Sequence, residues 1–214
     1  MNTIGANFLV ALRATLVTLV LTGLLYPLAI TGAAQLGFSD RANGSLVVDA
    51  HGQEVGSELI GQAFTAAVYV HGRPSANSYD ASNSGGTNLG TTSKKLRDGT
   101  VDDPATPDVD ESFAGARQLA EAFRRDNDLA ADAEVPADAV TRSASGLDPH
   151  VSPETALAQA PRIAAARRVD VARVETVIRE QVLGRELGLL GEERVNVLGV
   201  NLALDRMFGV TIHQ

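Results

Sequence analysis

Apolar positions dominate one long stretch near the N-terminus of this chain. No formal charge occurs between Arg13 and Asp40, and Ala14 to Ala34 reads ATLVTLVLTGLLYPLAITGAA. A helix of about 20 apolar residues spans the hydrocarbon core of a bilayer. The pattern therefore predicts a transmembrane helix over about residues 14–34, within an N-terminal segment of residues 1–39.

A cleaved signal peptide is the competing interpretation of this stretch. Signal sequences carry about 7 to 15 apolar residues before a cleavage site made of small residues. Thr31, Ala33 and Ala34 resemble such a site, but the apolar run is longer than a signal peptide needs. We therefore favour an uncleaved anchor.

Small and mildly polar residues recur every three or four positions along the predicted span. They share one face of a helix, formed by Thr15, Thr18, Thr22, Tyr26, Ala29 and Ala33. Such faces let helices approach and hydrogen-bond each other in lipid, so we expect partner helices there, although threonine is also tolerated in spans without partners. Pro27 lacks a backbone donor and predicts a kink in this helix.

Shorter apolar runs after the span predict one mixed α+β (α/β) soluble domain over residues 40–214. Strands are expected at Leu46–Val48, at Leu59–Ile60 and over Arg194–Val200, and the first two are joined by a turn near His51 and Gly52. Gly72 to Gly90 is rich in Gly, Ser and Asn and is expected to be a loop. Asp98 to Asp110 is acidic, contains proline and is expected to be a solvated excursion.

Helices of this domain are indicated by capping residues next to apolar stripes. The expected starts and stops are a cap at Asp110 before a stripe that includes Phe113, a start at Ser152 and Pro153 with a break at Pro161, a start at Asp170 with an end at Gly188 or Gly191, and a closing turn capped by Asn201.

Charge restricts the partners and the orientation of the chain. Residues 40–214 hold 17 of the 18 Lys and Arg and all 26 Asp and Glu, a net charge of −9. This acidity argues against nucleic-acid binding, in which Lys and Arg must neutralise phosphate. Arg13 lies on the N-terminal side of the span, whereas Asp40 and Arg41 cancel on the other side, which favours a cytoplasmic N-terminus and an external domain. Zero cysteine excludes disulfides and thiolate chemistry.

For each group of candidate functional residues in the loops, a purely structural role is the alternative. Backbone amides of Ser84 to Thr87 could form a nest for an anion such as phosphate, or Gly85 and Gly86 could only allow a sharp turn. Asp148 and His150 could do acid–base work, although a structural role is favoured because no nucleophile stands in a recognisable context. The four histidines are scattered without zinc-helix spacing, so no metal site is expected.

Five separated motifs resemble one family. They are YPLAITGAAQ from Tyr26, GSELIGQAF from Gly56, RPSANSYDASNSGGTNLG from Arg73, AVTRSASGLDPHVSPETA from Ala139 and RVNVLGVNLALD from Arg194. Together they are similar to the C subunit of the Kdp high-affinity potassium-transporting ATPase. Gly199 departs from the pattern, where a larger or charged residue is expected.

The resemblance implies a single-span, non-catalytic subunit in the bacterial cell membrane. Its partners would be the ATP-hydrolysing P-type subunit, the potassium-translocating subunit and membrane lipid, and potassium would be the transported ion. In that family the subunit acts as a catalytic chaperone that raises the ATP affinity of the catalytic subunit, and it has no cofactor of its own. The sequence agrees by lacking an Asp-Lys-Thr-Gly motif and a phosphate loop.

Three routes to that role remain open: direct nucleotide contact, allosteric action through the span, and assembly of the larger chains. The charge asymmetry favours the second and third routes. The residues that are candidates for nucleotide binding or partner contact are Arg73, Ser75, Ser84, Gly85, Gly86, Thr87, Asn88, Ser145, Gly146, Asp148 and His150.

A different class of function is an anchored extracytoplasmic serine hydrolase. Ser145 or Ser84 would be its nucleophile and His150 its base. Ser145 lies in Ser-Ala-Ser-Gly and lacks the G-x-S-x-G elbow of such enzymes, so this alternative is disfavoured.

Overall fold

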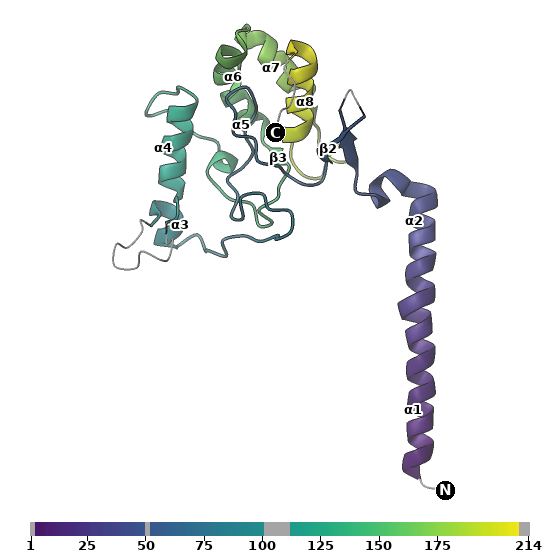
Figure 1. Ribbon diagram of the computed structural model, residues 1–214. Coiled ribbons are helices and arrows are strands. Elements are labelled where there is room, and N and C mark those ends of the chain that lie inside the picture. Colours follow the sequence, from purple (N-terminus) through teal and green to yellow (C-terminus); the bar gives the residue numbers. More distant parts are fainter. Residues whose placement is uncertain (1–2, 50–51, 101–111, 210–214) are drawn as a thin grey trace. The chain divides into compact units, whose positions relative to one another are not determined.

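The N-terminal part of the chain is one long helix. The computed structural model describes residues 3–49, 52–100 and 112–209. Helix α1 (Thr3–Val20), a π-helical turn η1 (Leu21–Leu25) and helix α2 (Tyr26–Ala42) follow each other without a gap (Figure 1). Residues up to Leu46 form one compact unit, and those from Val47 form a second. By length and composition, the helix can cross a membrane.

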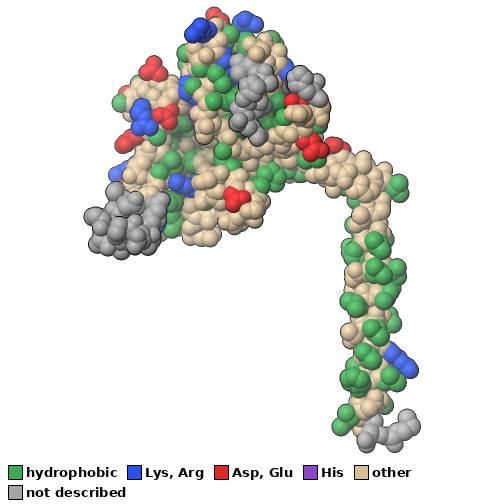
Figure 2. Space-filling view, in the orientation of Figure 1, with side chains coloured by type: hydrophobic (Ala, Val, Ile, Leu, Met, Phe, Trp, Pro, Cys, Tyr) green, Lys and Arg blue, Asp and Glu red, His purple; other side chains and the backbone are tan. Residues whose placement is uncertain are grey.

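Hydrophobic side chains surround this helix and are exposed along its length (Figure 2). Two of its threonine hydroxyls are paired within the helix. Thr18 Oγ1 donates to the carbonyl of Ala14 at 2.8 Å, and Thr22 Oγ1 donates to that of Thr18 at 2.7 Å. Lipid cannot satisfy polar groups, so these bonds remove the cost of two hydroxyls in the span.

The helix departs from regular geometry at two places. The π-helical turn Leu21–Leu25 lies just before Pro27, whose missing donor disturbs the hydrogen-bond ladder of the preceding turn. A second break occurs at Phe38, whose φ of −145° and ψ of 39° are not helical. The sequence indicated the first place and not the second.

The second unit mixes short helices with two small sheets, as the sequence predicted (Figure 1). Its elements are β1 (Leu46–Val48), β2 (Glu54–Ser57), α3 (Lys94–Asp98), α4 (Ala116–Asp126), the 3₁₀ turn η2 (Ala137–Ala139), β3 (His150–Val151), α5 (Pro153–Ala158), α6 (Ala160–Arg167), α7 (Val171–Glu180), β4 (Val182–Leu183), β5 (Arg194–Asn196) and α8 (Val197–Phe208). Strands β1 and β2 pair, and β5 lies between β3 and β4, antiparallel to both.

The hydrophobic core lies among α5, α6, α7, α8 and strand β5. Figure 1 shows these helices gathered on one side of the unit, with α3 and α4 apart from them. The fully buried large apolar side chains are Val70, Ile163, Val174, Ile178, Val195, Val200 and Leu204. Helix α4 contributes no buried residue, so its apolar stripe is half-buried and not part of this core.

An irregular segment around Val70 contributes to this core without joining a sheet. The buried amide of Asn201 pairs with both the N–H and the carbonyl of Val70, at 2.8 and 2.9 Å. The buried amide of Gln159 does the same for His71, at 2.8 and 3.2 Å. Arg162 donates to the carbonyl of Tyr69 at 3.0 Å. Side chains thus satisfy backbone groups that burial would otherwise leave unpaired.

Two of the expected strands are corrected. The strand expected over Arg194–Val200 ends at Asn196, because helix α8 begins at Val197. The strand Leu46–Val48 is present, but its partner is Glu54–Ser57 and not Leu59–Ile60. Ile60 makes only an isolated bridge to Ser57. The expected turn near Gly52 is present, since Gly52 donates to the carbonyl of Asp49 at 3.2 Å, whereas His51 lies outside the described residues.

The helix expected from Asp110 begins later, at Ala116. Phe113 is not helical, because it pairs with Thr100 through two backbone bonds of 2.9 and 3.1 Å. The guanidinium of Arg142 lies 4.2 Å from the centre of the Phe113 ring. Asp110 and most of the acidic excursion lie outside the described residues.

The caps at Ser152 and Asp170 and the break before Pro161 are confirmed. The helix from Asp170 ends at Glu180, not at Gly188 or Gly191, because Val182 and Leu183 pair with β5 instead. Helix α8 is capped by Asn196, whose Oδ1 accepts from the N–H of Gly199 at 2.9 Å. Asn201 is no cap, since its amide is bound to Val70.

Candidate functional site

The two glycine-rich loops that the sequence singled out lie against each other. The N–H of Gly85 donates to the carbonyl of Ser145 at 2.8 Å, and Ser84 Oγ donates to the same carbonyl at 3.1 Å. A Cβ on Gly86 would lie 2.9 Å from the carbonyl oxygen of Ala144, so only glycine fits there. Residues 60 apart in sequence therefore form one loop pair.

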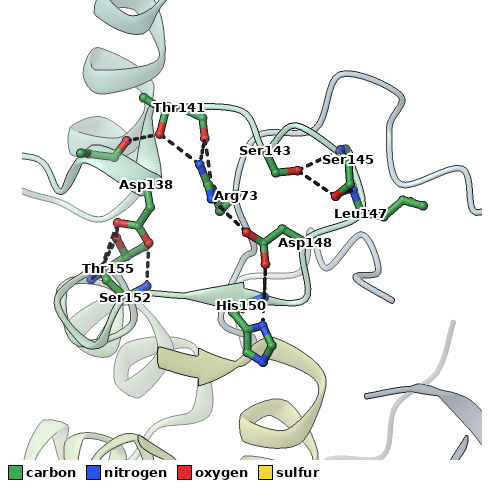
Figure 3. A network of polar contacts seen from close by, with 12 residues as sticks. Arg73, Asp138, Thr141, Ser143, Ser145, Leu147, Asp148, His150, Ser152 and Thr155 are labelled. Atoms are coloured by element: carbon green, nitrogen blue, oxygen red, sulfur yellow. Dashed lines mark hydrogen bonds and ion pairs between the residues drawn. The ribbon is translucent and has the colours of Figure 1, made fainter. Parts of the chain in front are cut away.

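Arg73 precedes the first loop and binds Thr141 and Asp148, which lie on either side of the second loop (Figure 3). Its Nη1 donates to Asp148 Oδ2 at 2.9 Å, forming an ion pair whose side chains are about a quarter exposed. Its Nε and Nη2 both donate to the carbonyl of Thr141, at 3.2 and 3.1 Å. The guanidinium is thus directed at partners within the chain from three of its nitrogens.

Asp148 is the carboxylate at the centre of this network. Besides Arg73, its Oδ1 accepts from the backbone N–H of His150 at 3.0 Å and lies 3.7 Å from His150 Nδ1 (Figure 3). Burial alone would raise the pKa of Asp148, but hydrogen bonds from His150 and Arg73 outweigh burial and hold this pKa below its ordinary value. Asp148 is therefore a structural anion and is poorly suited to act as a proton acceptor.

Ser75 fixes the start of the first loop. Its hydroxyl oxygen lies 2.7 Å from both the carbonyl oxygen of Gly146 and Asn77 Oδ1, either of which can accept its single proton, and it accepts from the N–H of Tyr79 at 3.0 Å. The Tyr79 hydroxyl donates back to the carbonyl of Arg73 at 2.8 Å. Burial, with the nearby charge of Asp148, raises the pKa of Tyr79 to about 12, so the phenol stays protonated as a donor.

Asp138 extends the same network towards helix α5, although no sequence pattern singled it out. Its carboxylate accepts from the N–H of Ser152 at 2.6 Å, from Ser152 Oγ at 2.9 Å and from Thr155 Oγ1 at 2.6 Å (Figure 3). Ser152 and Thr155 are the N-cap pair of α5, so Asp138 ties that helix start to the loop before it. Capping patterns identify the helix end and not the distant carboxylate.

The geometry does not form a catalytic triad. Ser145 Oγ accepts from the N–H of Leu147 at 3.1 Å and lies 3.4 Å from Ser143 Oγ, while the ring of His150 faces Asp148 (Figure 3). In the described part of the chain, no hydrogen bond joins a serine hydroxyl to His150. A hydrolase needs this bond to activate its nucleophile, so the arrangement gives that alternative no support.

The remaining candidates lie at the edge of the network. Gly146 adopts a left-handed φ of 69° and packs against Asn77, where a Cβ would come within 2.4 Å of the amide oxygen. Thr87 is half-buried, and Asn88 is exposed with a φ of 53°. Within the ranges described, no group of three His, Asp or Glu side chains could hold a metal ion.

Comparison with known proteins gives this network its context. A family model described as the c chain of the K⁺-transporting ATPase matches residues 8–206. The chain belongs to this family. Its motifs from Arg73 and from Ala139, far apart in sequence, are those that meet in the loop pair.

Individual relatives cover nearly the whole chain. A potassium-transporting ATPase KdpC subunit of Myxococcus xanthus is 55% identical over 206 residues, which are 95% of this chain and 90% of the relative. Proteins of the same name from Mycobacterium bovis and Koribacter versatilis are 48% and 44% identical, over 94% and 93% of this chain and 98% and 94% of those relatives. The chain is thus a subunit of a membrane complex that transports potassium, with other subunits as its partners.

Proposed function

We propose that this chain is a non-catalytic accessory subunit, which stabilises the ATP-driven potassium uptake complex and raises the ATP affinity of its catalytic subunit without binding ATP itself. The observation that carries the proposal is the family match over residues 8–206, because it includes both the span and the loop network. The proposed partners are the ATP-hydrolysing P-type subunit, the potassium-translocating subunit and the surrounding lipid.

Internal contacts of the loop pair argue against direct nucleotide binding. A phosphate group at Arg73 would have to displace Asp148, which holds the guanidinium at 2.9 Å. The N–H of Gly85, one of the amides that could form an anion nest, already donates to Ser145. We therefore infer that the network keeps the domain's shape, and that its effect on ATP is indirect.

The proposed orientation rests on charge. Arg13 is the one basic residue on the N-terminal side of the span, which favours the cytoplasm for that end. The domain of residues 40–214, with its net charge of −9, would then lie outside the cell. An external domain cannot reach cytoplasmic ATP, so this orientation and the indirect route support each other.

We predict that single cysteines on the two sides of the span differ in their labelling, and the absence of native cysteine makes this a clean measurement. Asp132→Cys lies in an exposed turn of the domain, and Thr3→Cys at the start of the helix. In intact cells with a permeable wall, a membrane-impermeant maleimide is expected to label Asp132→Cys. Thr3→Cys is expected to react only after the membrane is opened.

The reverse pattern would place the domain in the cytoplasm and overturn both the orientation and the indirect route. Each cysteine variant is the matched control for the other. Both should react fully with the maleimide once detergent has dissolved the membrane. Labelling of neither in cells, with full reaction in detergent, would also contradict the external placement.

A further inference from the structure

The long N-terminal helix changes direction near its end. Phe38 has a φ of −145° and a ψ of 39°, and residues 39–42 return to helical geometry after it. Figure 1 shows the ribbon of α2 leaving the line of the long helix at this end. The last helical turn therefore runs in a different direction from the rest of the helix. We call residues 35–43 the bend.

A pair of side-chain amides holds the bend. Gln35 Nε2 donates to Asn43 Oδ1 at 3.1 Å, and Asn43 Nδ2 lies 3.5 Å from Gln35 Oε1. Residues eight positions apart on a straight helix are separated by about 12 Å along its axis, so the change of direction lets these two side chains meet. The N–H of Ser45 donates to the carbonyl of Asp40 at 3.0 Å as the chain leaves the last turn. The bend is thus a defined conformation that contacts on both sides of Phe38 maintain.

The bend lies at the depth where the helix should leave the bilayer. About 20 helical residues cross the hydrocarbon core, so a span that begins at Ala14 reaches the far side near Ala34. Phe38 follows about 6 Å further along the helix, within a headgroup layer of about 5 to 7 Å. Asp40 then ends the uncharged run. The bend therefore falls in the membrane interface, between hydrocarbon and bulk water.

The side chains of the bend suit this layer. Leu36 is 92% exposed and Phe38 is 66% exposed. Asp40 and Arg41 carry opposite charges beside them, and neither forms an ion pair with a residue that the structure describes. Leucine and phenylalanine next to charged side chains are typical of helices that lie in the membrane interface. A phospholipid supplies a phosphate that a guanidinium can bind, with apolar chains directly beneath it.

We propose that the bend is an interfacial anchor, in which Leu36 and Phe38 insert between the acyl chains and headgroups of one leaflet and residues 39–42 lie along the membrane surface. The occupant is phospholipid of the leaflet on the side of the soluble domain. Lipid is chosen over protein because the bend continues, without a gap, a helix that exposes apolar side chains along its length.

Such an anchor fixes the depth of the span. Withdrawal into water would expose Leu36 and Phe38, and movement the other way would carry Asp40 and Arg41 into hydrocarbon. Both displacements cost free energy, so the helix has one preferred depth. Either orientation of the chain allows this anchor, which therefore stands apart from the proposed external domain.

The first test measures depth, and the absence of native tryptophan makes a single introduced tryptophan the only reporter. The full chain with Phe38→Trp is reconstituted into phosphatidylcholine vesicles that carry bromine either near the headgroup or near the ends of the acyl chains. Bromine near the headgroup is expected to quench this variant at least about twofold more strongly than bromine near the chain ends. Leu24→Trp, near the middle of the span, is the matched control and is expected to show the opposite preference.

Three results would overturn the interfacial depth. Stronger quenching of Phe38→Trp by bromine near the chain ends would place this position in the hydrocarbon core. Quenching by aqueous iodide but by neither brominated lipid would place it in water. Equal quenching by both brominated lipids would show no preferred depth.

The second test identifies the occupant in the assembled complex. After illumination, Phe38→benzoylphenylalanine is expected to form at least about tenfold more adduct with phospholipid than with the other subunits. Leu24→benzoylphenylalanine, at a position of the span that is 53% exposed, is the control for reactivity with lipid. Another subunit as the main adduct at Phe38, or no lipid adduct there while the Leu24 variant reacts with lipid, would overturn the proposal.

Discussion

At the residue scale, two buried polar side chains determine the path of the segment that contains Val70 and His71. Asn201 and Gln159 are at most 1% exposed, and each pairs with both backbone groups of one residue. The sequence pattern assigned Asn201 to the cap of a closing helical turn. An amide letter is equally compatible with a cap and with a buried clamp, because the difference lies in a partner 131 residues away.

Asp148→Asn is expected to lower the stability of the domain at neutral pH by about 1–2 kcal/mol, because Arg73 loses its charged partner. The pKa of Asp148 is held down in the folded state. Its stabilising contribution is therefore present above the ordinary carboxyl pKa of about 3.9 and disappears as pH falls through the lower folded value. The difference between wild type and variant should shrink between about pH 5 and about pH 3.

Urea unfolding of the full chain in detergent, followed by circular dichroism at several pH values, measures this difference. Asp132→Asn, in an exposed turn, is the control and should change little. A gap between wild type and Asp148→Asn that grows as the pH falls would contradict the role given to the Asp148 carboxylate.

Contact between two loops decides the shape of the site at the scale of elements. Gly86 packs on Ala144, and Gly146 packs on Asn77 and Gly85. The glycine-rich composition indicated loops correctly, whereas it left open whether the glycines served an anion or a sharp turn. The structure adds a third reason, which is close approach of two backbones.

Gly146→Ala is expected to destabilise the domain by about 1–3 kcal/mol. Its φ of 69° is unfavourable for alanine, and the new Cβ would come within 2.4 Å of Asn77 Oδ1 and 2.8 Å of the Gly85 carbonyl. Gly90→Ala is the matched control, because its Cβ would meet no atom within 4 Å. Thermal unfolding of both variants tests the difference, and equal midpoints would show that the loops are not held by this contact.

The transmembrane face is the feature that belongs to the scale of the whole molecule. The hydroxyls of Thr18 and Thr22 form hydrogen bonds inside their own helix. These two residues therefore contribute to helix packing through their small size and not through free hydrogen-bond donors. We expect Thr18→Leu combined with Ala29→Leu to weaken assembly by about tenfold, because enlarged side chains prevent close helix approach. Co-purification of the larger subunits measures this effect.

The same variant is expected to raise the KM for ATP in the complexes that still assemble, if the span transmits the effect on nucleotide. Val20→Leu, which lies off this face, is the control and should change neither quantity. Normal assembly and normal KM in the enlarged-face variant would exclude the span as the route.

The sequence by itself determined the features that depend on neighbours in the chain. Continuous apolarity determined the long helix, Ser152 and Asp170 determined helix starts, and Pro161 a break, because hydrophobic periodicity and capping act over a few residues. The family motifs likewise identified the family without coordinates.

Only the tertiary structure decided which distant groups meet. Arg73 and Asp148 are 75 residues apart, and Asn201 and Val70 are 131 apart. Helix α4 begins at Ala116 because Phe113 is engaged by Thr100, and Asn196 rather than Asn201 caps α8 because the buried amide is already occupied. Local propensities are worth fractions of a kcal/mol per residue, so one buried polar contact of 1–3 kcal/mol, by order of magnitude, overrides them.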